Sequence, residues 1–210
     1  MSQSLSKKQL LAQAEYCKKN GLDDLVMFYM KEVLKSGYNL EYFERKMLFS
    51  SISSKKKALF NALDELSNSE SQKADKTVVK SLQSKLKQEL WLVCQSAIKF
   101  LGTKEVRRDL SPEAAVDYLI FEGAQFASKA RCEQLIDEGK DERRKRFANE
   151  ARSIFEKANR RAVNELEGHN VVRMNAAIQL AKLYLDQFGL CDEASILAND
   201  ALVSATTAES

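Results

Sequence analysis

The chain contains a single histidine, His169, and this limits the chemistry that its side chains can perform. Metal-dependent hydrolysis and histidine-dependent nucleophilic catalysis need several histidines, or one beside a nucleophile. His169 instead follows Gly168, in a segment that is typical of a turn or a helix cap. The sequence also lacks the glycine-rich motifs GxGxxG and GxxxxGK that bind dinucleotides and phosphates. We therefore expect a protein that is not an enzyme and that holds no cofactor.

The cysteines are the next candidates for chemistry, because thiolates bind zinc and form disulfides. They are widely dispersed and form no CxxC pair: Cys17, Cys94, Cys132 and Cys191. This spacing indicates neither a zinc site nor the disulfide framework of a small secreted protein. We interpret all four as buried free thiols and expect no metal site.

A run of basic side chains at Arg143–Arg146 is the strongest local charge feature. One interpretation is a patch for nuclear import or polyanion binding. The other is the solvated start of a helix, whose charge is largely cancelled by neighbouring acids at Asp137, Glu138, Asp141 and Glu142. The net charge of only +3 favours the second interpretation. We expect no nucleic-acid partner and keep a helical polyanion binder as the alternative.

The elements that position these residues are predicted to be helices. One proline and seven glycines in 210 residues leave few tight turns, and apolar residues recur at helical spacing. Stop and start signals occur at Asn20-Gly21, Ser36-Gly37 and Ser111-Pro112. We predict an all-α antiparallel array of about eight helices in a single domain, 1–210, with helices at about 6–20, 23–36, 41–66, 76–101, 112–136, 142–165, 171–188 and 191–205.

The amino-terminal residues carry no apolar signal region, and no apolar run approaches the roughly 20 residues that span a bilayer. The cytoplasm is the expected compartment, with access to the nucleus as an open alternative, and no membrane partner is expected.

Several short motifs resemble the 14-3-3 family. They are Asp23-Asp24-Leu25, Met30-Lys31-x-Val33, Glu44-Arg45, Glu89-Leu90-x-x-Val93-Cys94, Tyr118-Leu119-x-x-x-Gly123, Gly168-His169, and Glu193-Ala194-x-x-Leu197-Ala198. The resemblance covers nearly the whole chain. It implies a cup of antiparallel helices that dimerises through its first four helices, about 1–101. It also implies a groove, formed by about 41–66, 112–136 and 171–188, that binds phosphoserine or phosphothreonine segments.

The resemblance also implies a set of cationic side chains that bind the phosphate, and other residues stand at those positions in this chain. The family's lysine and two arginines on the third helix fall on Ser53, Phe60 and Asp64. On the fifth helix, a lysine falls on Ile120 and an arginine–tyrosine pair falls on Ala127-Ser128. The sequence ends at Ser210, so the family's ninth helix is expected to be absent. We expect phosphate recognition to be weakened or lost.

Other cations are positioned to replace part of that set. Lys57 lies one turn after Ser53, Arg131 lies one turn after Ala127, and Lys182 replaces an apolar groove residue. Our hypothesis is a displaced basic site for acidic or phosphorylated segments, with Gln179 replacing the family's backbone-binding asparagine. The alternative is that Lys182 pairs with Asp186 while Lys57 and Arg131 are solvated.

The predicted dimer face keeps more of the family pattern. Lys85 and Glu89 are expected to meet Asp24 and Lys18 or Lys19 of a second subunit, with association supplied by the apolar residues Leu11, Leu63 and Leu82. The alternative is that these side chains pack within one subunit. The sequence thus predicts a dimeric adaptor or scaffold that binds other proteins. A pseudo-adaptor that heterodimerises with an ordinary 14-3-3 chain is the alternative in the same class.

Overall fold

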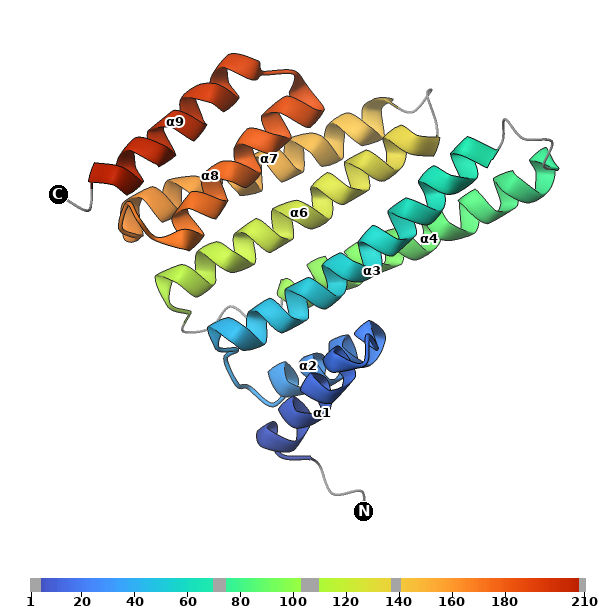
Figure 1. Ribbon diagram of the computed structural model, residues 1–210, viewed down its shortest axis with the longest axis horizontal. Helices are drawn as coiled ribbons and strands as arrows, with labels where there is room; N and C mark the ends of the chain where they lie inside the picture. The colour runs from blue at the N-terminus through green and yellow to red at the C-terminus, as the bar shows by residue number, and fades with distance from the viewer. Residues whose placement is uncertain (1–4, 70–74, 103–109, 137–140, 208–210) are drawn as a thin grey trace. The chain divides into compact units, whose positions relative to one another are not determined.

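The computed structural model describes residues 5–69, 75–102, 110–136 and 141–207, and every regular element among them is helical (Figure 1). This confirms the all-α prediction. The chain divides into two compact units, Met1–Asp109 and Leu110–Ser210. A single domain over 1–210 stays a prediction.

The first unit contains α1 (Lys7–Lys19), α2 (Asp23–Lys35), α3 (Tyr42–Ser69) and α4 (Lys76–Leu101). Helix α1 packs on α2 and α3, α2 packs on α3, and α3 packs on α4. Ser6 and Gln9 form a reciprocal capping box at the start of α1. Gly21 and Gly37 follow α1 and α2 with positive φ angles of 69° and 79°, which confirms the predicted helix ends.

The second unit contains α6 (Pro112–Ile136), α7 (Asp141–Glu165), α8 (Val171–Leu183), the π-helix η1 (Tyr184–Phe188) and α9 (Cys191–Thr207). Helix α6 packs on α7 and α8, α7 packs on α8, and α8 packs on α9. Ser111 caps α6 as predicted, since its hydroxyl accepts a hydrogen bond from the Ala114 amide at 3.2 Å.

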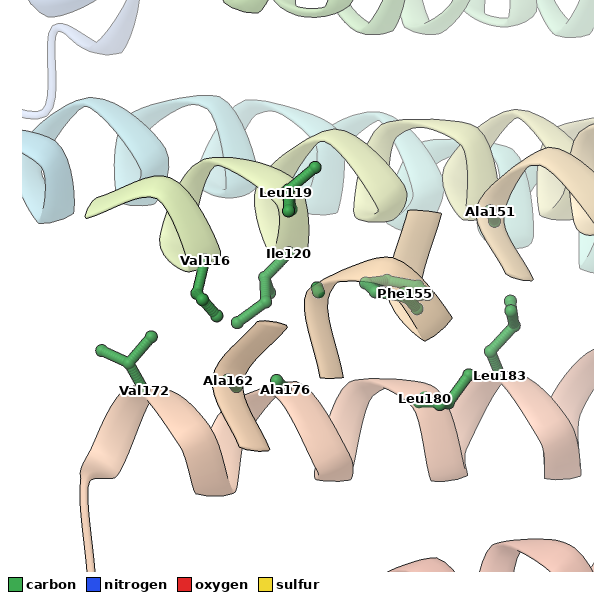
Figure 2. Packing of buried hydrophobic residues seen from close by; sticks show 11 residues of the cluster. Val116, Leu119, Ile120, Ala151, Phe155, Ala162, Val172, Ala176, Leu180 and Leu183 are labelled. Atoms are coloured by element: carbon green, nitrogen blue, oxygen red, sulfur yellow. The ribbon is translucent and has the colours of Figure 1, made fainter. Parts of the chain in front are cut away.

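The core of the second unit joins α6, α7 and α8 (Figure 2). Alanines line the inner face of α7 on both sides of Phe155, which is 2% exposed. Gly123 of α6 lies directly against this ring, because a Cβ atom added there would be 2.8 Å from Cε1 of Phe155. Small side chains on both helices therefore let α6 and α7 pack at short distance.

Three details differ from the sequence-based expectations. Helix α3 continues past Leu66 to Ser69. The last turn predicted for the helix at 171–188 is a π-helix, closed by Gly189 in the left-handed conformation with a φ of 66°. Cys191 is exposed at the start of α9, so its expected burial was wrong, whereas Cys17, Cys94 and Cys132 are buried free thiols as predicted.

Candidate functional site

Helix α3 carries four of the predicted groove positions, and they differ in exposure. Ser53 and Lys57 are exposed, Asp64 is half-buried, and Phe60 is buried. Phe60 is therefore part of the interior and presents no polar group. Lys57 is an exposed cation of the first unit, one turn after Ser53 as predicted.

Helix α6 carries the other three positions where the resemblance implies phosphate-binding residues. Ile120 belongs to the core of the second unit, and Ala127 packs against the same core. Figure 2 shows Ile120 directed from α6 toward α8. The Ser128 hydroxyl donates a hydrogen bond of 2.7 Å to the Ala124 carbonyl of its own helix. None of these three side chains carries a charge, so none can form a charge-assisted bond to a phosphate.

The displaced cations of the second unit lie at the surface. Arg131 of α6 and Lys182 of α8 are exposed. Gln179 is half-buried, and its amide nitrogen donates to Oδ1 of Asn175 at 3.2 Å. No ion pair joins Lys182 to Asp186 among the described side chains. Asp186 lies in the π-helix, whose wider turn changes the four-residue relation on which that alternative depended.

A cluster around Arg152 was not predicted from the sequence. Its Nε atom is 2.7 Å from Oε1 of Glu156, and the Tyr184 hydroxyl donates to the same oxygen at 3.0 Å. The guanidinium also lies 5.3 Å from the ring centre of Tyr184 and 5.5 Å from that of Phe188. The four-residue spacing of Arg152 and Glu156 indicates an ion pair, but no sequence signal predicts that the π-helix adds two aromatic rings.

Burial and hydrogen bonding shift the pKa values in this cluster. Burial acts to raise the pKa of Glu156, but the hydrogen bonds from Arg152 and Tyr184 outweigh it and lower the pKa below its ordinary value. The pKa of Tyr184 is raised by burial and by its hydrogen bond to Glu156. The cluster therefore holds Glu156 as an anion, bound by donors from α7 and η1.

The predicted dimer residues lie on the first unit, and several make contacts within the subunit. Lys55 of α3 bridges Oδ1 of Asp24 at 2.7 Å and Oε1 of Glu89 at 3.3 Å. Lys18 pairs with Asp23 at 3.2 Å and donates to the Ser51 hydroxyl at 3.1 Å. These side chains therefore have partners within one subunit, and their contacts with a second subunit stay a prediction.

The other predicted dimer residues differ in exposure. Lys19, Lys85 and Leu82 are exposed and Leu11 is half-buried, so all four are accessible to a second subunit. Leu63 is only 1% exposed. Its expected place in the interface was wrong, because the helical stripe that carries it faces the interior.

Lys55 stands at the edge of a hollow of about 440 Å³ between α2, α3 and α4. Burial acts to lower the pKa of Lys55, but the hydrogen bonds and negative charges of Asp24 and Glu89 outweigh it and raise the pKa. This bridge was not predicted from the sequence, because its three side chains come from three helices.

The basic run Arg143–Arg146 occupies the first turns of α7. Arg146 forms an ion pair with Glu150, at 3.2 Å between Nε and Oε1. Of the acids expected to cancel this charge, Asp137 and Glu138 lie outside the described residues. His169 lies in the turn before α8, as predicted. Within the described ranges, no group of three histidine, cysteine or acidic side chains is placed to hold a metal ion.

No helix in the described part of the chain is both long enough and apolar enough to cross a membrane.

Two comparisons with known proteins agree with the helical arrangement. A family model described as "14-3-3 protein" matches residues 12–209. The chain is also similar to "14-3-3 protein 2" of Entamoeba histolytica, with 23% identity over 179 residues, which is 82% of this chain and 72% of that protein.

Proposed function

Because the chain belongs to the 14-3-3 family, we propose that it is a non-enzymatic adaptor that binds segments of other proteins with weakened or lost recognition of phosphate. The observation that carries this proposal is that three positions of α6 carry no charge. Ile120 is in the core, Ala127 packs against it, and the Ser128 hydroxyl is bonded within its own helix. On this helix, the positions where the resemblance implies phosphate-binding residues therefore carry no cation.

The expected loss of affinity follows from the strength of the missing bonds. A hydrogen bond to a charged group contributes about 1.5–3 kcal/mol, and each 1.4 kcal/mol is about a tenfold change in affinity. Losing three such bonds removes at least roughly three orders of magnitude. Asp64 adds a negative charge at a fourth position, which opposes a phosphate dianion.

We further propose that exposed cations at other positions attract acidic or phosphorylated segments. In the second unit these are Arg131 and Lys182, together with Gln179, whose amide nitrogen donates to Asn175 and whose amide oxygen is proposed to accept from a peptide backbone. In the first unit the corresponding cation is Lys57, which is exposed on α3. The charge on these side chains supports a preference for acidic over neutral peptides.

The first unit is proposed to mediate homo- or heterodimer formation, through the exposed residues Leu82, Lys85 and Lys19 together with Leu11. The pairing of Asp24 and Glu89 with Lys55 in the same subunit leaves fewer charges for a partner. The cytoplasm is the proposed compartment, because the buried thiols Cys17, Cys94 and Cys132 fit a reducing environment. Sedimentation velocity tests the dimer: a strictly monomeric protein at micromolar concentration contradicts it.

Fluorescence anisotropy with matched peptides tests the adaptor proposal. Each peptide is made with serine, phosphoserine or glutamate at one position, and an ordinary 14-3-3 protein serves as the positive control. We expect phosphoserine to improve binding by less than about tenfold. A preference of a hundredfold or more would show that the phosphate grip is intact and would overturn the proposal.

Charge reversal tests the displaced cations. Arg131→Glu combined with Lys182→Glu is expected to weaken the glutamate and phosphoserine peptides about tenfold. Lys157→Glu is the matched control, since Lys157 is an exposed lysine of α7 outside the predicted groove helices. Equal losses in both proteins would indicate non-specific attraction and would contradict the assignment.

A further inference from the structure

A trough runs along the second unit, with α8 as its floor and α7 and α9 as its walls. Both α7 and α9 pack on α8, and Figure 1 shows the three helices as neighbours. Two hollows of about 500 Å³ and 390 Å³ lie in this trough. They share two residues of α7, Asn159 and Val163, and two of α9, Leu197 and Asp200. We call this feature the α7–α9 trough.

The trough has an apolar lining that is open to solvent. Leu180 of α8 is buried at its floor, and Val163 and Ile196, from opposite walls, are 49% and 60% exposed. Exposed apolar side chains that converge on a concave surface are typical of binding sites. Its volume is sufficient for several side chains of a partner.

Some of the charged side chains around this lining have partners, and others have none in the described part of the chain. Glu156 is bound by Arg152 and Tyr184, and Arg173 donates to the Leu166 carbonyl at 2.9 Å at the end of α7. Glu193 and Asp200 on the α9 wall form no ion pair with any described side chain. On the opposite wall, Arg160 of α7 also lines the trough and is exposed. The α9 wall therefore presents two unpaired carboxylates beside an apolar surface, whereas the α7 wall carries one cation.

The spacing of these two acids indicates the form of the partner. Glu193 and Asp200 are seven residues apart on one helix, which places them about 10.5 Å apart along its axis. A partner helix that lies along α9 presents side chains at the same seven-residue interval. Lysines or arginines at that interval match both carboxylates, while apolar side chains on the same face meet Val163, Ile196 and Leu197.

We propose that the α7–α9 trough binds a basic amphipathic helix of another protein. This site goes beyond the proposed peptide-binding function, because Gln179 and Lys182 of α8 do not line the trough. The two sites have opposite charge preferences: the displaced cations attract acidic segments, and the α9 wall of the trough attracts basic ones. A single adaptor subunit thereby contacts two different partners.

Two synthetic 18-residue helical peptides test this proposal on the full chain. Both carry the same leucine stripe, with lysines seven residues apart in the basic probe and glutamates in the acidic probe. We expect the basic probe to bind at least about tenfold more tightly by fluorescence anisotropy, which corresponds to about 1.4 kcal/mol. A basic probe interrupted by proline is expected to lose this binding, because proline breaks the helix. Equal binding of basic and acidic probes, or of intact and interrupted probes, overturns the proposal.

Variants of α9 test whether the basic probe binds in the trough. Glu193→Lys with Asp200→Lys is expected to weaken the basic probe at least about tenfold, and Ile196→Ser is expected to weaken both probes. Asp192→Lys is the matched control, because Asp192 is an exposed acid of the same helix that does not line the trough. Equal losses in the control overturn the assignment. Hydrogen exchange checks that each variant folds. If the double variant does not fold, the comparison of basic and acidic probes on the unaltered chain tests the proposal.

The outcome is separable from the proposed function. Arg131→Glu with Lys182→Glu leaves the trough intact and is expected to change binding of the basic probe by less than about twofold. If acidic peptides fail to bind anywhere while the basic probe binds as described, the proposed function fails and the trough proposal stands.

Discussion

Substitution of Gly123 by alanine provides a sharp test of how closely α6 and α7 pack. The added Cβ atom lies 2.8 Å from Cε1, 2.9 Å from Cδ1 and 3.1 Å from Cζ of Phe155, whereas carbon atoms in contact are ordinarily about 3.5–4.0 Å apart. Phe155 is only 2% exposed, and Ala151 and Ala158 of the same helix are fully buried. The ring therefore has little space into which to move.

Two opposing effects set the size of the change. Replacing glycine by alanine inside a helix contributes about 1 kcal/mol of stability through helix propensity. Overpacking a well-filled core costs about 1–3 kcal/mol, and contact with three atoms of one rigid ring places this site near the upper end. We expect a net loss of about 1–2 kcal/mol in the free energy of unfolding of the second unit.

The measurement must report on the second unit alone. The single tryptophan, Trp91, lies on α4 in the first unit, so its fluorescence is unsuitable. Hydrogen exchange of peptides from α6 and α7 gives the local stability directly, and a loss of 1–2 kcal/mol is expected to accelerate exchange about 5- to 30-fold.

Two further variants make this prediction refutable. Gly102→Ala, measured by hydrogen exchange at the end of α4 in the first unit, is the control, because its Cβ atom would lie 3.4 Å from the nearest atom, the Ile98 carbonyl oxygen, at a φ of −79°. Phe155→Leu in the Gly123→Ala background is expected to recover part of the loss in a double-mutant cycle. Unchanged or slower exchange in Gly123→Ala, or a cycle without coupling, would refute the close contact.

Three other predictions concern capping and electrostatics. Asn170→Ala is expected to lower the free energy of unfolding by about 1–2 kcal/mol. Its Oδ1 accepts from the Val172 amide at 2.8 Å, and its Nδ2 donates to Glu113 at 2.6 Å. Faster hydrogen exchange at the start of α8, absent in the exposed control Asn199→Ala, checks this prediction. The lowered pKa of Glu156 stabilises the fold above the ordinary value of 4.5, and this contribution is lost as pH falls through the lower folded-state pKa. Glu156→Gln should therefore lessen the fall of thermal stability below about pH 4.5, and an unchanged acid profile would contradict this. Lys55→Met is expected to lower stability by less than about 1 kcal/mol, since Asp24 and Glu89 are largely exposed. That loss should shrink in 1 M salt. It should also shrink as pH rises above 10.5 and through the higher folded-state pKa of Lys55, because the positive charge is then lost. A loss independent of salt and pH, or one equal to that of Lys57→Met, would point to packing instead.

Local signals were sufficient to predict most of the helices. Lys76–Leu101 was predicted with the bounds that the structure has, and glycines after α1 and α2 marked where those helices end. Such signals depend on a few neighbouring residues, so they are visible in one sequence. The π-helix at Tyr184–Phe188 was missed, because its formation accompanies contacts with Arg152 from another helix.

Side-chain pairing was harder to predict than helix position. The resemblance indicated which cationic positions are replaced, but helical spacing alone did not distinguish Phe60 and Ile120, which are buried, from Lys57, which is exposed. The bridge from Lys55 to Asp24 and Glu89 depends on the rotation of three helices about their axes. The α7–α9 trough depends in the same way on three packed helices, so the sequence showed its residues without showing that they converge.

The burial of Ile120 makes the change at this position difficult to reverse. Its side chain is 7% exposed among the core residues of the second unit, and burying such a side chain stabilises a fold by about 1.5–3 kcal/mol. Restoring a lysine there would remove that contribution and would also desolvate a charge. Ile120 thus contributes stability at a position where the resemblance implies a ligand-binding lysine. Evolution back toward phosphate binding would therefore require compensating substitutions elsewhere in the core before the lysine could be accepted.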